Sequence, residues 1–280
     1  MTDETPAKQD EKHVVKNSWH HLRRFTDARI GLGRAGNSIP TSALLAFQMD
    51  HANAQDAVHI PLDRAKLAAE LPSQHDQLLL KSQAHDRATY LQRPDLGRRL
   101  SPESAAHIQA YKTKIQQTTP TQIGNIGLVI ADGLSSTAVQ RHAAEMTHLI
   151  CHHIASSADT LAPICLVEQG RVAIGDEIGE LLGVDLLVLM IGERPGLSSP
   201  DSLGIYYTYN PKIGRQDANR NCISNIRPGG LSFEDAKNKL FWLIEESKKL
   251  QQSGVMLKDE SDNTPSQIAT GRQDNFLLPD

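Results

Sequence analysis

Three imidazoles and a thiol gather within six residues near the middle of the chain: His148, Cys151, His152 and His153. On a helix, His148 and His152 lie one turn apart on the same face, as paired zinc ligands do. Zinc hydrolases of the H-E-x-x-H type also need a glutamate directly after the first histidine, and that position holds Leu149. Two imidazoles make an incomplete metal site. The pattern favours exposed or half-buried histidines, and we predict no metal-ligating residue.

The residues from Gly31 to Gly36, GLGRAG, have the spelling of a dinucleotide-binding loop, G-x-G-x-x-G. Such a loop follows a buried strand and opens a helix whose N-terminus holds the pyrophosphate. Here the preceding RRFTDARI carries four charges, too many for a strand buried on both faces, and Pro40 follows before any helix. The spacing favours a structural glycine turn over a nicotinamide site. A weaker possibility stays open, in which glycine amides beside Arg29 and Arg34 hold an anion or a partner chain.

The strongest functional signal lies in the loops that follow three apolar runs. Residues 132–136, 168–172 and 192–199 are rich in small and polar residues, and 219–222 and 225–230 are similar. In open parallel sheets, ligands bind outside the carboxyl ends of the strands. Ordinary turn chemistry explains many of these glycines and serines, but not the length of the 193–204 loop. We therefore expect a cofactor-binding edge there.

These loops are positioned by an alternation of strands and helices. The apolar runs 125–131, 162–168 and 184–192 are separated by the helical stretches 137–155 and 172–182. This spacing predicts βαβ units, and hence an α/β fold with a Rossmann-like parallel sheet flanked by helices. Two shorter strands are expected at 205–209 and 222–226. Ser232 is the expected cap of a last helix.

The first half of the chain is predicted to be a helical N-terminal arm. Pro40 and Thr41 start one helix, Ser73 a second that runs through 78–80, and Ser101 with Pro102 a third. We expect a disordered N-terminus at 1–20, a helical partner-docking region at 21–117, the Rossmann-like domain at 118–257 and a polar tail at 258–280.

Composition narrows the function classes. The chain has 280 residues, with 29 Lys and Arg against 33 Asp and Glu, so its net charge is 29 − 33 = −4. This acidic balance and the 4% of aromatic residues disfavour a nucleic-acid binder. Three cysteines argue against a disulfide scaffold and for a reducing cytoplasm. The first residues lack the apolar core of a signal peptide, and run 184–191 is too short to cross a bilayer.

The chain as a whole resembles the small (light) subunit of ethanolamine ammonia-lyase. The matching blocks lie in order between about residues 24 and 255: RFTDARIGLGRAG, IPTSALLAFQMDHANAQDAVH, YLQRPDLGRRL, IADGLSSTAV, RVAIGDEIGELLG, IGERPGLSSPDSLGIYYTYNP and NCISNIRPGGLSFEDAKNKL. The resemblance implies an adenosylcobalamin-dependent lyase that converts ethanolamine to acetaldehyde and ammonia. An adenosyl radical, formed by homolysis of the cofactor's Co–C bond, abstracts hydrogen from the substrate.

In that family the large subunit, a TIM barrel, holds the substrate, and the small subunit closes over the cobalamin. The resemblance therefore implies a hetero-oligomer with the large subunit as partner, and no catalytic residue in this chain. It places the cobalamin contacts at Val172, Glu193 and Cys222. If these residues serve only the fold, Val172 is an apolar contact at a helix start, Glu193 is a helix cap and Cys222 fills space in the core. Relatives can be targeted to a bacterial microcompartment by an amphipathic N-terminal helix, which this polar N-terminus does not show.

The histidines bear on how cobalt is held. All twelve lie at or before His153, and none follows an aspartate by two residues, so the D-x-H-x-x-G motif is absent. We expect base-on adenosylcobalamin, with its nucleotide tail near the 132–136 and Glu193 loops. Two alternatives remain: a stand-alone nucleotide or cobalamin carrier, and a free-standing NAD enzyme that uses the Gly31 to Gly36 loop.

Overall fold

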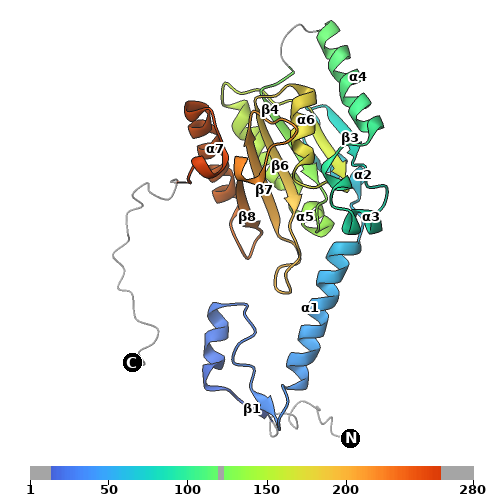
Figure 1. Cartoon of the computed structure of the whole chain (residues 1–280). Helices are drawn as coiled ribbons and strands as arrows, with labels where there is room; N and C mark the ends of the chain where they lie inside the picture. Colours follow the sequence, from blue (N-terminus) through green and yellow to red (C-terminus); the bar gives the residue numbers. More distant parts are fainter. Residues whose placement is uncertain (1–13, 119–122, 260–280) are drawn as a thin grey trace, which may run out of the picture.

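The computed structural model describes residues 14–118 and 123–259, and its centre is a six-stranded sheet with helices on both faces (Figure 1). The strand order is β3-β5-β4-β6-β7-β8. These strands are β3 (Gln77–Lys81), β4 (Ile126–Ala131), β5 (Ile164–Glu168), β6 (Leu186–Gly192), β7 (Leu203–Tyr209) and β8 (Arg220–Ile226). The helices are α1 (Thr41–His59), α2 (Arg64–Glu70), α3 (Arg87–Gln92), α4 (Pro102–Thr118), α5 (Ser136–Ala155), α6 (Ile174–Leu182) and α7 (Phe233–Leu250).

The predicted α/β fold with parallel βαβ strands flanked by helices is confirmed, and the complete sheet is mixed. Strands β3, β5, β4 and β6 run parallel, whereas β7 is antiparallel to β6 and β8 is antiparallel to β7. The reason lies in the connections. A parallel crossover needs a dozen or more residues, usually with a helix. Only the ten residues 193–202 join β6 to β7, and they contain no helix, so the chain turns back.

The helix predicted to run from Ser73 through residues 78–80 is wrong. Gln77–Lys81 is β3, which pairs in parallel with β5 at the edge of the sheet. Leu78 and Leu80 are buried, while Leu79 between them is exposed. That alternation is the signature of a strand, and three successive leucines mask it. The range predicted to be helical thus supplies one strand of the main sheet.

Two cores lie on opposite faces of the sheet, because alternate residues of a strand point to opposite sides. Leu128 and Ile130 of β4 join the core beneath α5 and α7. Val129 and Ala131 join the second core, beneath α4 and α6. Every residue of β4 and of β6 is buried, as expected for strands covered on both faces.

Predicted start signals set the two longest helices of the sheet region. The Ser135 side chain accepts a hydrogen bond from the Ala138 N–H and so caps α5. The Ser232 side chain accepts from the Asp235 N–H and caps α7. The Ser232 cap was predicted from the sequence.

The amino-terminal segment, residues 14–59, lies apart from the sheet. Helix α1 extends away from the sheet, and the small hairpin of β1 (Val14–Val15) and β2 (Arg34–Ala35) lies near its far end (Figure 1). Of the 19 residues of α1, only Ala57 is buried. Most of the N-terminus predicted at 1–20 and of the tail predicted at 258–280 lies outside the described residues, which begin at 14 and end at 259. None of the described helices is long and apolar enough to cross a membrane.

Candidate functional site

Glu193 stands directly after β6, where its side chain is held in one orientation. Its Oε2 atom accepts a hydrogen bond from the Ser202 hydroxyl at 2.5 Å and another from the Asn225 N–H at 3.1 Å. Gly204 leaves room for this carboxylate, because a Cβ there would lie 2.9 Å from Glu193 Oε1. Among the described residues, the hydrogen bonds to this carboxylate end on Oε2. Oε1 therefore remains an acceptor, and Glu193 is not a helix cap.

Cys222 lies on β8, on the same face of the sheet as Glu193. It stands opposite Tyr206 in the β7–β8 register, so the thiol and the Tyr206 side chain are neighbours. Desolvation raises the pKa of the Cys222 thiol, and the nearby Glu193 carboxylate raises it further against the effect of Tyr206. The thiol is therefore protonated at neutral pH. Cys222 is exposed, so the reading as core filler is wrong.

Val172 occupies the turn between β5 and α6. It is half-buried and packs against the second core, as Tyr206 does. Tyr206 stands opposite Leu189 of β6, which belongs to that core. Val172, Glu193, Tyr206 and Cys222 thus share one side of the sheet, and we call this surface the Glu193 face. Helix α6 begins at Ile174, two residues later than the predicted start.

Tyr206 is the member of the Glu193 face that sequence reasoning missed. Its signal was the alternation within 205–209, which places Ile205 and Tyr207 in one core and Tyr206 on the other side. Desolvation is the first cause that raises the pKa of the Tyr206 hydroxyl, followed by Cys222 and Glu193. The phenol is therefore a neutral donor between a neutral thiol and a carboxylate.

The polar side chains of the loop at 132–136 have partners within the chain. Asp132, Ser135 and Ser136 are buried, and their polar atoms have internal partners. The Ser135 hydroxyl donates to the Pro200 carbonyl at 2.7 Å, and the Ser136 hydroxyl donates to the Ile60 carbonyl. The expected contact of this loop with a nucleotide tail therefore stays a prediction, and it would have to be made by atoms other than these side chains.

The histidine cluster on α5 is used in packing. His148 Nε2 donates to the Glu70 carbonyl at 2.9 Å, and the His153 ring stacks on Phe241 with centroids 3.6 Å apart. Cys151 is buried, and burial raises the pKa of its thiol to about 11. The described part of the chain contains no group of three or more His, Cys, Asp or Glu residues arranged to hold a metal ion.

The glycines from Gly31 to Gly36 form a structural turn, as predicted. Gly31 and Gly33 have positive φ angles of 58° and 78°. A Cβ on Gly31 would lie 2.9 Å from the backbone of Trp19 and His20, and one on Gly33 would lie 2.5 Å from the Val15 carbonyl oxygen. Only glycine fits such positions. No buried strand precedes them, so the geometry of a dinucleotide site is missing.

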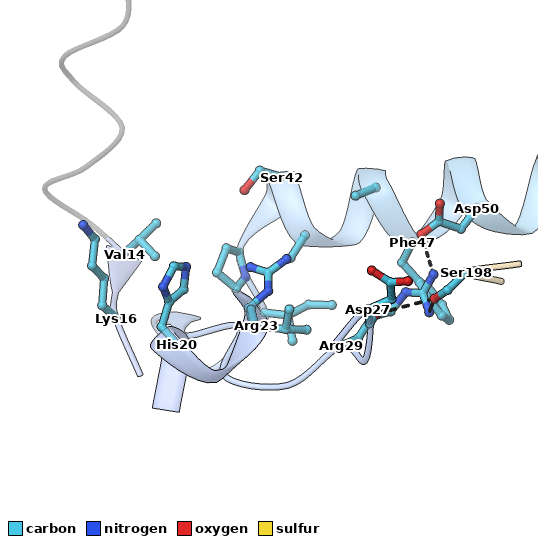
Figure 2. A pocket seen from close by; sticks show the side chains of 15 residues that line it. Val14, Lys16, His20, Arg23, Asp27, Arg29, Ser42, Phe47, Asp50 and Ser198 are labelled. Carbon is cyan, nitrogen blue, oxygen red and sulfur yellow. Dashed lines mark hydrogen bonds and ion pairs between the residues drawn. The ribbon is translucent and has the colours of Figure 1, made fainter. Parts of the chain in front are cut away.

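The same segment encloses a pocket of about 840 Å³ (Figure 2). The side chains of Lys16, His20 and Arg23 line it, as does the first turn of α1. At the other end, Arg29 Nη2 pairs with Asp50 Oδ2 at 2.5 Å, and Arg29 Nη1 donates to Ser198 Oγ at 3.3 Å. Ser198 belongs to the loop after β6. The pocket thus lies where the amino-terminal segment meets that loop, away from the Glu193 face.

The fold defines a class: an α/β protein whose mixed six-stranded sheet is flanked by helices, with Val172, Glu193 and Cys222 on one side of that sheet. Comparison with known proteins narrows this class. Residues 16–258 match the model of the family described as "Ethanolamine ammonia-lyase light chain (EutC)". The chain therefore belongs to the ethanolamine ammonia-lyase light-chain family.

Curated relatives agree over nearly their full length. The chain is 50% identical over 279 residues to the ethanolamine ammonia-lyase small subunit of Azotobacter vinelandii, which covers 99% of both chains. It is 52% identical over 266 residues to that of Pseudomonas fluorescens (strain Pf0-1), covering 94% of this chain and 95% of the relative. The Ralstonia nicotianae small subunit is 51% identical over 286 residues, covering 99% and 100%.

Proposed function

We propose that this chain is the small subunit of an adenosylcobalamin-dependent ethanolamine ammonia-lyase and that its Glu193 face covers the cobalamin. The observation that carries the proposal is that Val172, Glu193 and Cys222, taken from separate parts of the chain, lie on the same side of the sheet. When bound, adenosylcobalamin supplies an organic radical by homolysis of its cobalt–carbon bond. In this proposal the substrate lies in the large subunit, and this chain binds the cobalamin and encloses it.

The chemistry of the Glu193 face fits a corrin ring with amide side arms. Glu193 Oε1 is available to accept an amide N–H, and the two hydrogen bonds to Oε2 hold the carboxylate in place beforehand. Val172 and the Tyr206 ring supply apolar surface for a large flat ligand. Cys222 supplies a small neutral contact, since its raised pKa keeps it from acting as a thiolate ligand of cobalt.

The amino-terminal segment supports a large protein partner. Leu45 and Met49 of α1 are 59% and 62% exposed, and Trp19 and Phe25 before it are exposed too. A helix with a single buried residue gains little from packing within its own chain. Exposed apolar patches of this kind mark protein interaction sites. We propose that this segment docks on the large subunit and that the two chains form a hetero-oligomer in the cytoplasm. Any microcompartment address at 1–13 falls outside the described residues.

The cofactor is proposed to bind base-on. Imidazole is the usual protein donor to cobalt, and the Glu193 face carries none. His142, on α5, lies on the opposite side of the sheet, where it contacts Asp201 and Phe233. This chain then leaves the cofactor's own dimethylbenzimidazole on cobalt, with the nucleotide tail near the loop that follows Glu193.

Reconstitution from separate subunits tests the proposed function. Acetaldehyde formation from ethanolamine and adenosylcobalamin is measured for this chain alone, for the family's large subunit alone and for the two combined. We expect activity only in the combined sample. A stand-alone carrier would bind cobalamin without the large subunit and never release acetaldehyde. Lyase activity of the single chain would overturn the proposal as well.

A further inference from the structure

One arginine joins three segments that are distant in the sequence. Arg87, the first residue of α3, donates from Nε to the Val58 carbonyl of α1 at 2.7 Å. Its Nη1 donates to the Gly133 carbonyl at 2.9 Å and to Gln169 Oε1 at 3.3 Å. Its Nη2 donates to the Leu134 carbonyl at 3.3 Å. This side chain therefore fastens the end of α1 to the loops that follow β4 and β5.

Asp132 completes the arrangement from the end of β4. Its Oδ2 lies 3.6 Å from Arg87 Nη1 and accepts the Gln169 N–H at 3.0 Å, while its Oδ1 accepts the Gly170 N–H at 3.1 Å. Burial raises the pKa of this carboxyl to about 6, against the lowering effect of the two amides and of Arg87. A buried carboxylate needs such partners, and here they are supplied by the loop it shapes.

The loop after β5 is held in a conformation that it would not adopt freely. Gln169 has a φ of 56°, in the left-handed region that non-glycine residues seldom occupy. A Cβ on Gly170 would lie 2.9 Å from the Ala131 Cβ. Two residues later the same loop presents Val172. The position of Val172 on the Glu193 face thus depends on the grip of Asp132 and Arg87 on residues 169 and 170.

We propose that Arg87 and Asp132 are positioning residues that set the Val172 edge of the cobalamin site and tie it to the end of α1. The inference rests on the proposed function and adds a link, within this chain, between the docking helix and the cofactor site. The same guanidinium holds the helix that docks on the large subunit and the loop that meets the cofactor. The position of the docking helix and the shape of the cofactor site therefore both depend on the contacts of the Arg87 guanidinium.

The alternative is a role in stability alone, and a double-mutant cycle separates the two. The affinity for adenosylcobalamin is measured by absorbance titration of the assembled two-subunit complex. The variants are Arg87→Gln, Arg87→Lys, Val172→Ala and Cys222→Ala, with the pairs of Arg87→Gln with each alanine variant. Arg93→Gln is the matched control, because Arg93, in the turn after α3, is exposed and pairs with the neighbouring Asp95. Thermal unfolding checks that each variant is folded.

We expect Arg87→Gln to weaken cobalamin binding about tenfold, because it removes hydrogen bonds that hold the loop carrying Val172 in place. Arg93→Gln is expected to leave the affinity unchanged. Val172→Ala is expected to cost less when Arg87→Gln is already present, because the loop that carries Val172 is then loose. Cys222→Ala, on β8, is expected to cost the same in both backgrounds. Arg87→Lys keeps the positive charge but not the forked N–H donors of the guanidinium. Its loss of cobalamin affinity is therefore expected to lie between that of the unmutated complex and that of Arg87→Gln.

A second readout does not involve the cofactor. Amide hydrogen exchange at Gln169 and Gly170 is expected to quicken in Arg87→Lys, while exchange in α7 stays unchanged. Unchanged exchange in that loop, unchanged cobalamin affinity in Arg87→Gln, or an additive cycle with Val172 would each overturn the inference. If Val172→Ala and Glu193→Ala also bind cobalamin as tightly as the unmutated complex, the proposed function fails and the inference falls with it.

Discussion

Glu193 carries the most specific polar contact that we assign to the cofactor, because its carboxylate is oriented before any ligand arrives. Ser202 and Asn225 hold one oxygen, and Gly204 makes the space. Preorganisation of this kind lowers the cost of binding, since the side chain has little freedom left to lose. The neighbouring Tyr206 and Cys222 side chains are both neutral, so the carboxylate is the acceptor on this face.

Glu193→Ala is expected to weaken adenosylcobalamin binding by about 1–3 kcal/mol, the usual cost of leaving a buried donor without its acceptor. The KM for ethanolamine should change little, because we propose that the substrate lies in the large subunit. Titration of the assembled complex measures the first quantity and steady-state kinetics the second. Glu245→Ala is the control, since Glu245 lies on α7 and pairs with Lys248. An unaltered cofactor dissociation constant would return Glu193 to a purely structural role.

The sequence and the resemblance together predicted some residues of the proposed cofactor site and missed others. Glu193 and Cys222 were placed on strand-end loops by pattern and on the cofactor by resemblance. Tyr206 and Arg87 were missed. The partners of Tyr206 come from β6 and β8, and those of Arg87 from residues 58, 133, 134 and 169. Contacts between segments so distant in the chain leave no local spacing to read.

Among the elements, the βαβ core and the two strands expected at 205–209 and 222–226 were predictable, whereas the direction of those two strands and the strand β3 were not. Apolar runs predict the strands β4, β5 and β6. Serine residues at their caps mark the starts of helices α5 and α7. The direction of β7 depends on the short connection before it. The strand β3 depends on its pairing with β5, and a run of three leucines does not distinguish a strand from a helix.

Helix α1 gives a prediction at the element scale. The double variant Leu45→Glu with Met49→Glu is expected to abolish co-purification with the large subunit, because two charges would be buried at an apolar interface. The matched control is Val255→Glu, a residue 69% exposed at the opposite end of the chain. All three positions are exposed, so the fold should tolerate the three charges. Retention of the large subunit by the α1 variant would contradict the proposed docking surface.

The whole molecule is organised around two surfaces, an apolar α1 and the Glu193 face, that are joined near the carboxyl ends of the parallel strands. Ser198 of the loop after β6 meets Arg29 of the amino-terminal segment, and Arg87 ties α1 to the loops after β4 and β5. We therefore expect a partner that docks on α1 to be linked, through these contacts, to the loops at the carboxyl ends of the strands. This arrangement suits a subunit that closes over a cofactor shared with its partner.

The base-on proposal is tested in the assembled complex by electron paramagnetic resonance of bound cob(II)alamin. Labelling the cofactor's dimethylbenzimidazole with nitrogen-15 should change the nitrogen superhyperfine splitting, because that base then remains on cobalt. Labelling the protein's histidines should leave the splitting unchanged. The reverse pattern would show that a histidine has displaced the base, and the base-on assignment would be wrong.

The central claim is that cobalamin lies against the Glu193 face, and amide hydrogen exchange of the two-subunit complex tests it most directly. Exchange is measured with and without adenosylcobalamin, at a fixed ratio of the two subunits. We predict slower exchange at residues 169–173, 193–194 and 204–206 and around Cys222 when the cofactor is present. Exchange along α7, on the opposite side of the sheet, should not change. Slowing confined to α7 or to the large subunit, with no change on the Glu193 face, would contradict the account.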